Sequence, residues 1–362
     1  MAHSAYQKLA RVLDTLPNGF PATEDGIEIR LLEKIFEPEE AELFCELKLT
    51  FETAQQIAER TGRPIEELAA GLETMMEKGQ IFGVDLGGVK LYKMLPWAFG
   101  IYEFQMPRMD REMAELCEAY ANVYAGQFLS QKPQMMQVIP IESEVAGDHE
   151  ALSFEKVSSI IEKSESLMYF DCVCKKGKAL LGEPCDRPVQ VCTAYAPLPG
   201  IFENNHFGGK TMTRQEAYEL LERTEKEGLV HLTWNIKSGH YFICNCCGCC
   251  CSVLRGINEL GIKASHVIRS SYYAQIDPEL CEGCGLCADQ RCQVHAIEQE
   301  GDVYRVITEK CIGCGLCVST CPNEAVSLIR KPEDQIETPP EDELDWYQVR
   351  ARMRGVDITP YT

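Results

Sequence analysis

Apolar residues recur at helical spacing between residues 50 and 78, and two short runs with strand character follow. The first helical stretch begins after Thr53 and breaks at Gly62. The second stretch restarts at Pro64, a residue that suits the first turn of a helix, and ends at Gly79. Two glycines then join the strand-like runs IFGVDL and VKLYKML. The pattern predicts two helices followed by a β-hairpin.

Residues 1–108, a helical segment followed by these elements, are similar to a winged-helix domain. Winged helices usually bind DNA, but here the second helix carries four glutamates against one lysine, namely Glu66, Glu67, Glu73 and Glu77 against Lys78. The chain has a formal net charge of −21, and both its N-terminal and C-terminal parts are acidic. Because phosphate binding needs a basic face, we expect no nucleic acid partner and interpret the domain as a protein-docking module.

Residues 109–275 contain both helix-like and strand-like patterns of apolar residues. Residues 109–129 have an amphipathic helical pattern, and MMQVIPIE reads as a strand. Thr213 with Glu216 forms a capping box that opens a second helix, which ends at Gly228 before the strand-like LVHLTW. Beyond residue 330, an acidic linker with prolines leads to a tail with three arginines, at positions 350, 352 and 354. This tail (331–362) is expected either to lie on its own chain or to dock a partner.

Cysteine use is regional, since only Cys45 and Cys117 precede Cys172 among the 20 cysteines. The start of the chain has no apolar run of the signal-peptide kind, and no segment is long and apolar enough to span a bilayer. We therefore expect a cytoplasmic protein without a membrane span. In a reducing compartment, clustered cysteines are metal ligands or redox thiols more often than disulfides. The two isolated cysteines are expected to be packed thiols.

Two stretches near the C-terminus, CEGCGLCADQRC (281–292) and CIGCGLCVSTCP (311–322), form an internal repeat. Each has C-x2-C-x2-C spacing and a fourth cysteine four or five residues later. A 4Fe-4S cubane needs four thiolates, and a tight glycine-containing loop can present three of them. Structural zinc sites pair two C-x2-C knuckles instead, so the repeat favours iron–sulfur clusters. The flanking runs YYAQID, AIEQ, VYRVI and AVSLI are predicted strands.

The repeat resembles bacterial two-cluster ferredoxins, in which the last cysteine of each run binds the other cluster. The resemblance implies one 4Fe-4S cluster on Cys281, Cys284, Cys287 and Cys321, and another on Cys311, Cys314, Cys317 and Cys292. The first run departs from the second, because it has one more residue before its fourth cysteine and Gln293 in place of Pro322. The expected fold class is α+β: a winged-helix-like domain (1–108), a cysteine-rich α+β domain (109–275) and a ferredoxin-like domain (276–330).

The stretch ICNCCGCCC (243–251) repeats the same spacing at Cys244, Cys247 and Cys250. We expect these three to hold an additional cluster, with Cys192 as the first choice for the fourth ligand and Cys185 as the second. A further site is predicted from the remaining thiols of the region, namely Cys246 and Cys249 with Cys172 and Cys174, which leaves Cys251 over. A zinc site or reactive thiols are the alternative. Among the histidines of this region, His240 alone merits testing as a ligand.

The order of the motifs DCVCKKGKALLGEPCDRPVQVC, TRQEAYELLERTEKEGLVH, ICNCCGCCC and the dicluster repeat resembles a family of iron–sulfur proteins from anaerobic bacteria. The resemblance implies electron transfer. The sequence contains no G-x-G-x-x-G after a strand and no P-loop, so organic cofactors lack support. We expect an electron-transfer protein or subunit that works with a redox partner or a larger oxidoreductase complex. Two alternatives are an oxidoreductase with a substrate-binding cluster and a DNA-binding redox sensor.

Overall fold

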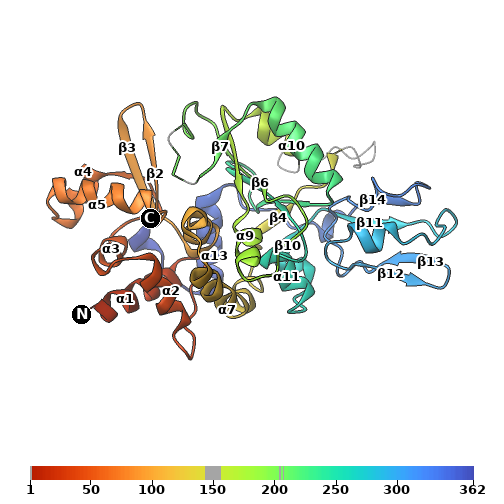
Figure 1. Ribbon diagram of the computed structural model, residues 1–362, viewed down its shortest axis with the longest axis horizontal. Coiled ribbons are helices and arrows are strands. Elements are labelled where there is room, and N and C mark those ends of the chain that lie inside the picture. The colour runs from red at the N-terminus through yellow and green to blue at the C-terminus, as the bar shows by residue number, and fades with distance from the viewer. Residues whose placement is uncertain (1, 143–155, 204, 207) are drawn as a thin grey trace.

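The computed structural model describes residues 2–142, 156–203, 205–206 and 208–362. The molecule is elongated, with the N-terminal helices at one end, a mixed helix-and-sheet body in the middle and the cysteine repeat at the other end (Figure 1). It is an α+β fold, as expected. No helix in the described ranges is both long enough and apolar enough to cross a membrane.

The N-terminal end consists of helices around a small sheet. Three helices come first, α1 (Ala2–Thr15), α2 (Ile27–Ile35) and α3 (Pro38–Phe44). They are followed by β1 (Glu52–Thr53), α4 (Ala54–Thr61), α5 (Ile65–Glu77), β2 (Ile81–Leu86) and β3 (Val89–Met94). Thr53 caps α4 by accepting a hydrogen bond from the Gln56 amide, and Gly62 ends it in the left-handed conformation. The three strands form an antiparallel sheet in the order β1-β3-β2.

A seven-stranded sheet forms the centre, in the order β10-β4-β8-β9-β6-β5-β7. Its strands are β4 (Met136–Val138), β5 (Ser166–Asp171), β6 (Gln190–Ala196), β7 (Lys210–Thr211), β8 (Val230–Trp234), β9 (Phe242–Cys246) and β10 (Ile268–Arg269). All neighbouring strands are antiparallel except β10 and β4. The helices of this part are α7 (Arg111–Phe128), α8 (Val157–Glu162), α9 (Val173–Leu180), α10 (Arg214–Lys226), α11 (Ser252–Asn258) and α12 (Ala264–Val267).

Short turns connect the N-terminal sheet to α7. They are a π-type turn at Trp97–Ile101, α6 (Tyr102–Phe104) and a 3-10 turn at Met106–Arg108. Trp97 is buried among aromatic rings, and its ring centroid lies 5.3 Å from that of Phe20. This segment lies between the N-terminal sheet and the central body, and α6 presents Glu103 to a cavity described below.

The cysteine repeat forms two small antiparallel ribbons. One pairs β11 (Tyr272–Ile276) with β14 (Val326–Arg330), and the other pairs β12 (Ile297–Glu300) with β13 (Val303–Val306). These are the four strands that the flanking sequence predicts, and their positions are confirmed. Pairing of β11 with β14 brings the two ends of the segment together, so the cysteine loops are held between the ribbons.

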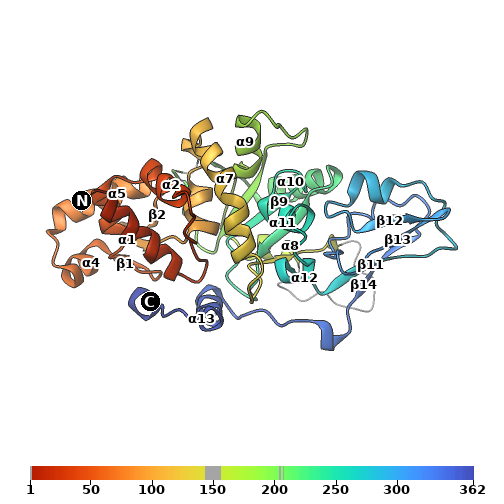
Figure 2. The ribbon, with the colours of Figure 1, turned by 90° about the horizontal axis from the view of Figure 1, so that it is seen from below.

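The C-terminal tail returns along the molecule to the N-terminal end (Figure 2). It contains a 3-10 turn at Glu333–Gln335, α13 (Glu343–Arg354) and a final turn at Thr359–Tyr361. Trp346 and Arg350 of α13 are fully buried. The Arg350 guanidinium donates to four backbone carbonyls, those of Pro17, Phe128, Gln131 and Pro133. Of the two alternatives for the tail, the structure shows it on its own chain.

Candidate metal centres

The two cysteine loops at the C-terminal end have matching backbone conformations. Gly283 and Gly313 have φ values of 67° and 66°, and Gly285 and Gly315 have values of 76° and 83°. These left-handed backbone conformations favour glycine, and they allow each loop to turn tightly between consecutive cysteines. A Cβ at Gly313 would also overlap the carbonyl oxygen of Tyr272. The glycines of CEGCGLC and CIGCGLC are thus required by the shape of the loops.

Backbone amides donate to the sulfur atoms at equivalent places in both loops. The Ala296 amide lies 3.1 Å from Cys292 Sγ, and the Ala325 amide lies 3.3 Å from Cys321 Sγ. Cys311 Sγ accepts from two further amides, at 3.4 Å each. Hydrogen bonds of this kind stabilise thiolates and tune the potential of a cluster bound to them. The loops are therefore suited to deprotonated, metal-bound cysteines.

The structure groups the C-terminal cysteines across the repeat. Cys292, Cys311, Cys314 and Cys317 line one small cavity, which is the predicted second set. In the other loop, Cys281 and Cys284 are close enough to Cys287 to raise the pKa of its thiol, although burial is the main cause of its rise to about 11. Cys321 packs in the same apolar cluster as Cys287. Cys292 thus lies with the loop that the ferredoxin resemblance implies, and the assignment of Cys321 stays a prediction.

The extra residue in the first run forms a π-helical turn. This turn spans Cys287–Arg291, and the Cys292 amide donates to the Cys287 carbonyl at 3.1 Å. A π-turn accommodates one residue more than an α-turn, so Cys292 keeps its position next to the other loop. The extra residue in the first run therefore changes the loop surface around this cluster site, but it does not displace Cys292.

The altered loop also joins the C-terminal domain to the middle of the chain. Gln293 Oε1 accepts a hydrogen bond of 2.9 Å from the Gly248 amide, and the Gln293 carbonyl accepts one of 3.0 Å from Asn258. The Arg291 guanidinium donates to the carbonyls of Glu225 and Lys226 at the end of α10. Gly248 stands between Cys247 and Cys249, so the cysteine-rich stretch touches the dicluster domain directly.

The ten cysteines of the middle region form two groups. Strand β9 presents Cys244 and Cys246 on one face, because residues two apart in a strand point the same way. The antiparallel register of β6 and β9 continues from Thr193 opposite Ile243, so Cys192 stands opposite Cys244. Cys172 follows the end of β5, the next strand. The larger group, called the six-cysteine group, comprises Cys172, Cys174, Cys192, Cys244, Cys246 and Cys251.

Neighbouring thiols of the six-cysteine group interact in series. Cys174 and Cys192 influence the pKa of Cys172, Cys244 influences that of Cys192, and Cys244 and Cys251 influence that of Cys246. Hydrogen bonds from Cys192 and Cys246 lower the pKa of Cys244 to about 7, and those from Cys174 and Cys192 lower the pKa of Cys172. All six thiols also line one cavity, so they are gathered in one part of the body. The arrangement offers several soft sulfur ligands to one metal centre.

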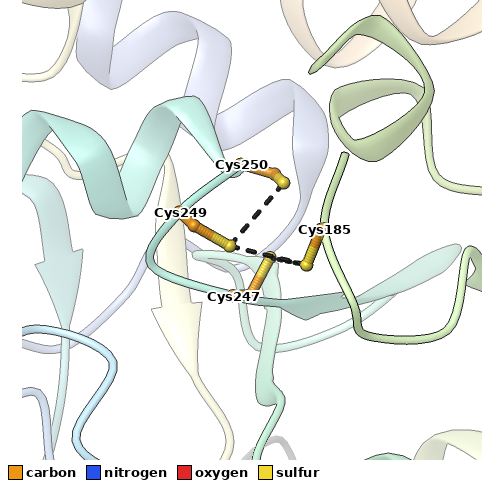
Figure 3. A group of neighbouring side chains, drawn as sticks. All are labelled: Cys185, Cys247, Cys249 and Cys250. Carbon is orange, nitrogen blue, oxygen red and sulfur yellow. Dashed lines mark hydrogen bonds between the residues drawn. The ribbon is translucent and has the colours of Figure 1, made fainter. Parts of the chain in front are cut away.

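The smaller group is compact and comprises Cys185, Cys247, Cys249 and Cys250 (Figure 3). Cys185 comes from the loop between α9 and β6, and the other three come from the turn after β9. The sulfur atoms all lie within 4.8 Å of one another. Cys185 Sγ lies 3.8 Å from Cys247 Sγ and 3.5 Å from Cys249 Sγ. This group, called the four-cysteine group, is described further below.

The structure brings the middle cysteines together in sets that differ from the expected ones. Cys247 and Cys250 lie with Cys185, whereas Cys244 and Cys192 lie in the six-cysteine group. The C-x2-C-x2-C run is divided because β9 ends at Cys246, so the first cysteine of the run is in a strand and the others are in a turn. Cys249 lies in the four-cysteine group, away from Cys246, Cys172 and Cys174. Cys251, which the expected sets did not include, lies in the six-cysteine group.

Other candidates from the sequence lie away from the thiols or are packed. The Nε2 of His240 lies 2.9 Å from the Gln137 amide nitrogen, and burial lowers the pKa of His240 to about 4. Cys45 Sγ donates to the Ala41 carbonyl, as expected of a packed thiol. Burial raises the pKa of Cys117 to about 12.

Lys175 is a functional candidate that the sequence pattern did not reveal. Its side chain is 1% exposed, and its ammonium donates to the Pro188 carbonyl at 2.9 Å. Its charge helps to lower the pKa of Cys172 in one group and of Cys247 in the other. A buried cation beside two thiol groups compensates for the negative charge that thiolates bring. The helical pattern of α9 contained no signal for this role, because lysines are usually on the surface.

A cavity of about 540 Å³ extends from the six-cysteine group towards the N-terminal sheet. Its walls are mostly apolar and aromatic, and they include Phe99 and Phe242, whose rings stack at 5.0 Å. Three exposed apolar side chains, Phe51, Leu86 and Leu198, line its outer end. Glu103 also lines it, and burial raises the pKa of this carboxyl to about 8. No pattern in the sequence pointed to Glu103, because its neighbours in the cavity come from distant segments.

Comparison with known proteins identifies the C-terminal part. Residues 274–328 match the 4Fe-4S dicluster domain family. No curated protein and no solved structure shows significant similarity to the chain. The match does not reach the N-terminal or the cysteine-rich part, so the wider resemblance to an anaerobic bacterial family stays a prediction. The chain thus carries a C-terminal 4Fe-4S dicluster domain joined to a cysteine-rich α+β body.

Proposed function

We propose that the protein is an iron–sulfur electron-transfer protein or subunit that passes single electrons between a partner oxidoreductase and another carrier. The dicluster domain carries this proposal, because 4Fe-4S clusters supply one-electron chemistry. One cluster is assigned to Cys281, Cys284, Cys287 and Cys321, and the other to Cys311, Cys314, Cys317 and Cys292. The cavity shared by the second set supports this crossed arrangement.

An additional cluster is assigned to the six-cysteine group. This group is buried or half-buried throughout, and cluster ligands are expected to be shielded in this way. Two of its members, Cys172 and Cys251, are the N-caps of α9 and α11, where helix amides favour negative charge on sulfur. The contact of Gln293 with Gly248 holds the dicluster domain against the cysteine-rich body. Electrons can then pass between the two parts within one chain.

The N-terminal elements are assigned to docking. Their order and the β1-β3-β2 sheet support a winged-helix-like domain. Glu66, Glu67 and Glu77 are exposed on α5, while Glu73 pairs with Lys90 at 2.8 Å. An acidic face of this kind suits a basic surface of a partner protein and repels nucleic acid phosphates.

A redox titration of the anaerobically purified full-length protein tests this function. We expect reversible one-electron steps and full re-oxidation by a one-electron acceptor, with the spectrum of neighbouring 4Fe-4S clusters in the reduced state. A protein that retains its iron and yet shows no reversible step within the range of iron–sulfur potentials would rule out the proposal.

The cavity favours a second candidate, an oxidoreductase whose middle cluster faces a bound substrate. A volume of about 540 Å³ is in the range of small-molecule sites. Aromatic walls suit a planar apolar compound, and a carboxyl with a raised pKa can donate a hydrogen bond to a carbonyl oxygen. Glu103 is also held in place, because its Oε2 accepts from the Gly100 amide at 2.7 Å.

Binding of the naphthyl ketone dye Prodan to the full-length protein tests this candidate. We expect its emission to shift to shorter wavelength on binding. Leu198→Glu, at the outer end of the cavity, should weaken binding at least about fivefold, because it places a charge beside an apolar ligand. Leu260→Glu is the matched control, since Leu260 is similarly exposed but lies outside the cavity. Absence of binding, or equal weakening in both variants, would argue against a substrate site.

A further inference from the structure

The four-cysteine group differs from the other thiol sites in the spacing of its sulfur atoms. Its neighbouring sulfurs are 3.5, 3.7 and 3.8 Å apart. No other set of three or more cysteine, histidine or acidic side chains in the described part of the chain brings its ligand atoms within 4.8 Å of one another. The cysteines of the dicluster domain are therefore more widely spaced than these four. The molecule contains two kinds of thiol site.

This spacing fits a single ion better than a cluster. A tetrahedral zinc ion binds thiolates at about 2.3 Å, which places neighbouring sulfurs about 3.8 Å apart. A cubane puts four irons and four sulfides between its thiolates, so its cysteines must lie further apart. The dicluster cysteines provide the comparison within the same chain, because they belong to a family that binds cubanes and they form no compact group.

The local chain also has the form of a zinc knuckle. Cys247 and Cys250 are a C-x2-C pair in a turn. Cys249 and Cys185 complete a set of four thiols from two segments (Figure 3). Four protein ligands close a tetrahedral site and leave no open position, which is typical of structural rather than catalytic zinc.

We propose that Cys185, Cys247, Cys249 and Cys250 hold one structural zinc ion. The ion joins the loop around residue 185 to the turn at residues 247–250, and this turn contains the Gly248 amide that binds Gln293. The zinc site thereby fixes the surface on which the dicluster domain rests. Zinc has no redox chemistry in proteins, so this group is not a step of the electron path.

Metal analysis of the full-length protein, expressed anaerobically with both iron and zinc supplied, tests the proposal. We expect about one zinc per chain in the wild-type protein. Cys249→Ser should lose most of this zinc and keep its iron. Cys45→Ser is the matched control, since Cys45 is a single packed thiol far from the group in sequence, and it should lose neither metal.

Zinc X-ray absorption of the wild-type protein keeps the test independent of how the variant folds. Four sulfur neighbours at about 2.3 Å are expected. A zinc-free protein, zinc bound through nitrogen or oxygen, or a loss of about four iron in Cys249→Ser would overturn the proposal. Because iron and zinc are counted separately, failure of the zinc site is distinguishable from failure of the electron-transfer function.

Discussion

The positive charge of Lys175 is expected to affect the reduction potential of a cluster bound beside it, and a single substitution can test this effect. Reduction adds negative charge to a cluster, and the buried ammonium of Lys175 next to Cys172 stabilises that charge. Lys175→Met removes the charge and keeps the length of the side chain. We expect the potential of the middle cluster to become more negative by some tens of millivolts, since nearby charge sets cluster potentials.

The control for this residue is Lys226→Met, because the Lys226 side chain is 80% exposed and its charge is screened by solvent. Potentiometric titration followed by EPR measures the potential of the middle cluster in both variants. A potential that is unchanged in Lys175→Met, or that moves in the positive direction, would contradict a role for this cation at the cluster.

Gly248 is the residue at which the cysteine-rich body meets the dicluster domain. A Cβ at this position would overlap the Gln293 carbonyl oxygen, so Gly248→Ala should push the two domains apart. We expect a lower unfolding temperature and faster proteolysis between them. Gly126→Ala on α7 is the control, because a Cβ there meets no atom within 4 Å. That helical substitution should be neutral or stabilise by up to about 1 kcal/mol. Equal unfolding temperatures and equal proteolysis rates in the two variants would show that the contact between Gly248 and Gln293 is unimportant.

Helix α13 ties the C-terminal tail to the N-terminal end of the molecule. Arg350→Met would leave four backbone carbonyls without their donor, two of them in buried hydrogen bonds, at a cost of about 3 kcal/mol or more. We expect thermal unfolding to begin several degrees lower. Arg352→Met, an exposed arginine on the same helix, should change it little. A tail that only docked a partner would give two variants of equal stability.

The sequence predicted helices and strands correctly where capping residues, glycines or short apolar runs mark their ends. Thr53 and Gly62 delimit α4 as expected, and the four strands around the cysteine repeat lie where the sequence predicted them. The C-x2-C-x2-C spacing of the dicluster recurs at residues 244–250, but there a strand ends inside the run and turns Cys246 and Cys247 apart. That outcome depends on the pairing of β9 with β6 and β8, which are long-range contacts and leave no local pattern.

At the scale of the whole molecule, the cysteine-rich body lies between the two ends of an elongated chain. The dicluster domain stands at one end and the acidic N-terminal helices stand at the other, with the six-cysteine group in the sheet between them (Figure 1). The positions of Lys175, Glu103 and Arg350 could not have been read from the chain, since each depends on groups distant in sequence. The α+β class and the dicluster, with its repeated spacing, were visible at this scale from the sequence.

Iron and acid-labile sulfide, counted in the full-length protein and in Cys244→Ser, test the central claim most directly. Two dicluster centres account for about eight iron atoms per chain, and a centre in the six-cysteine group raises the count to about twelve or more. We expect Cys244→Ser to lose at least about three iron atoms and to keep the EPR signal of the two C-terminal clusters. About eight iron atoms in both proteins would contradict the account, because electrons could then use only the dicluster domain.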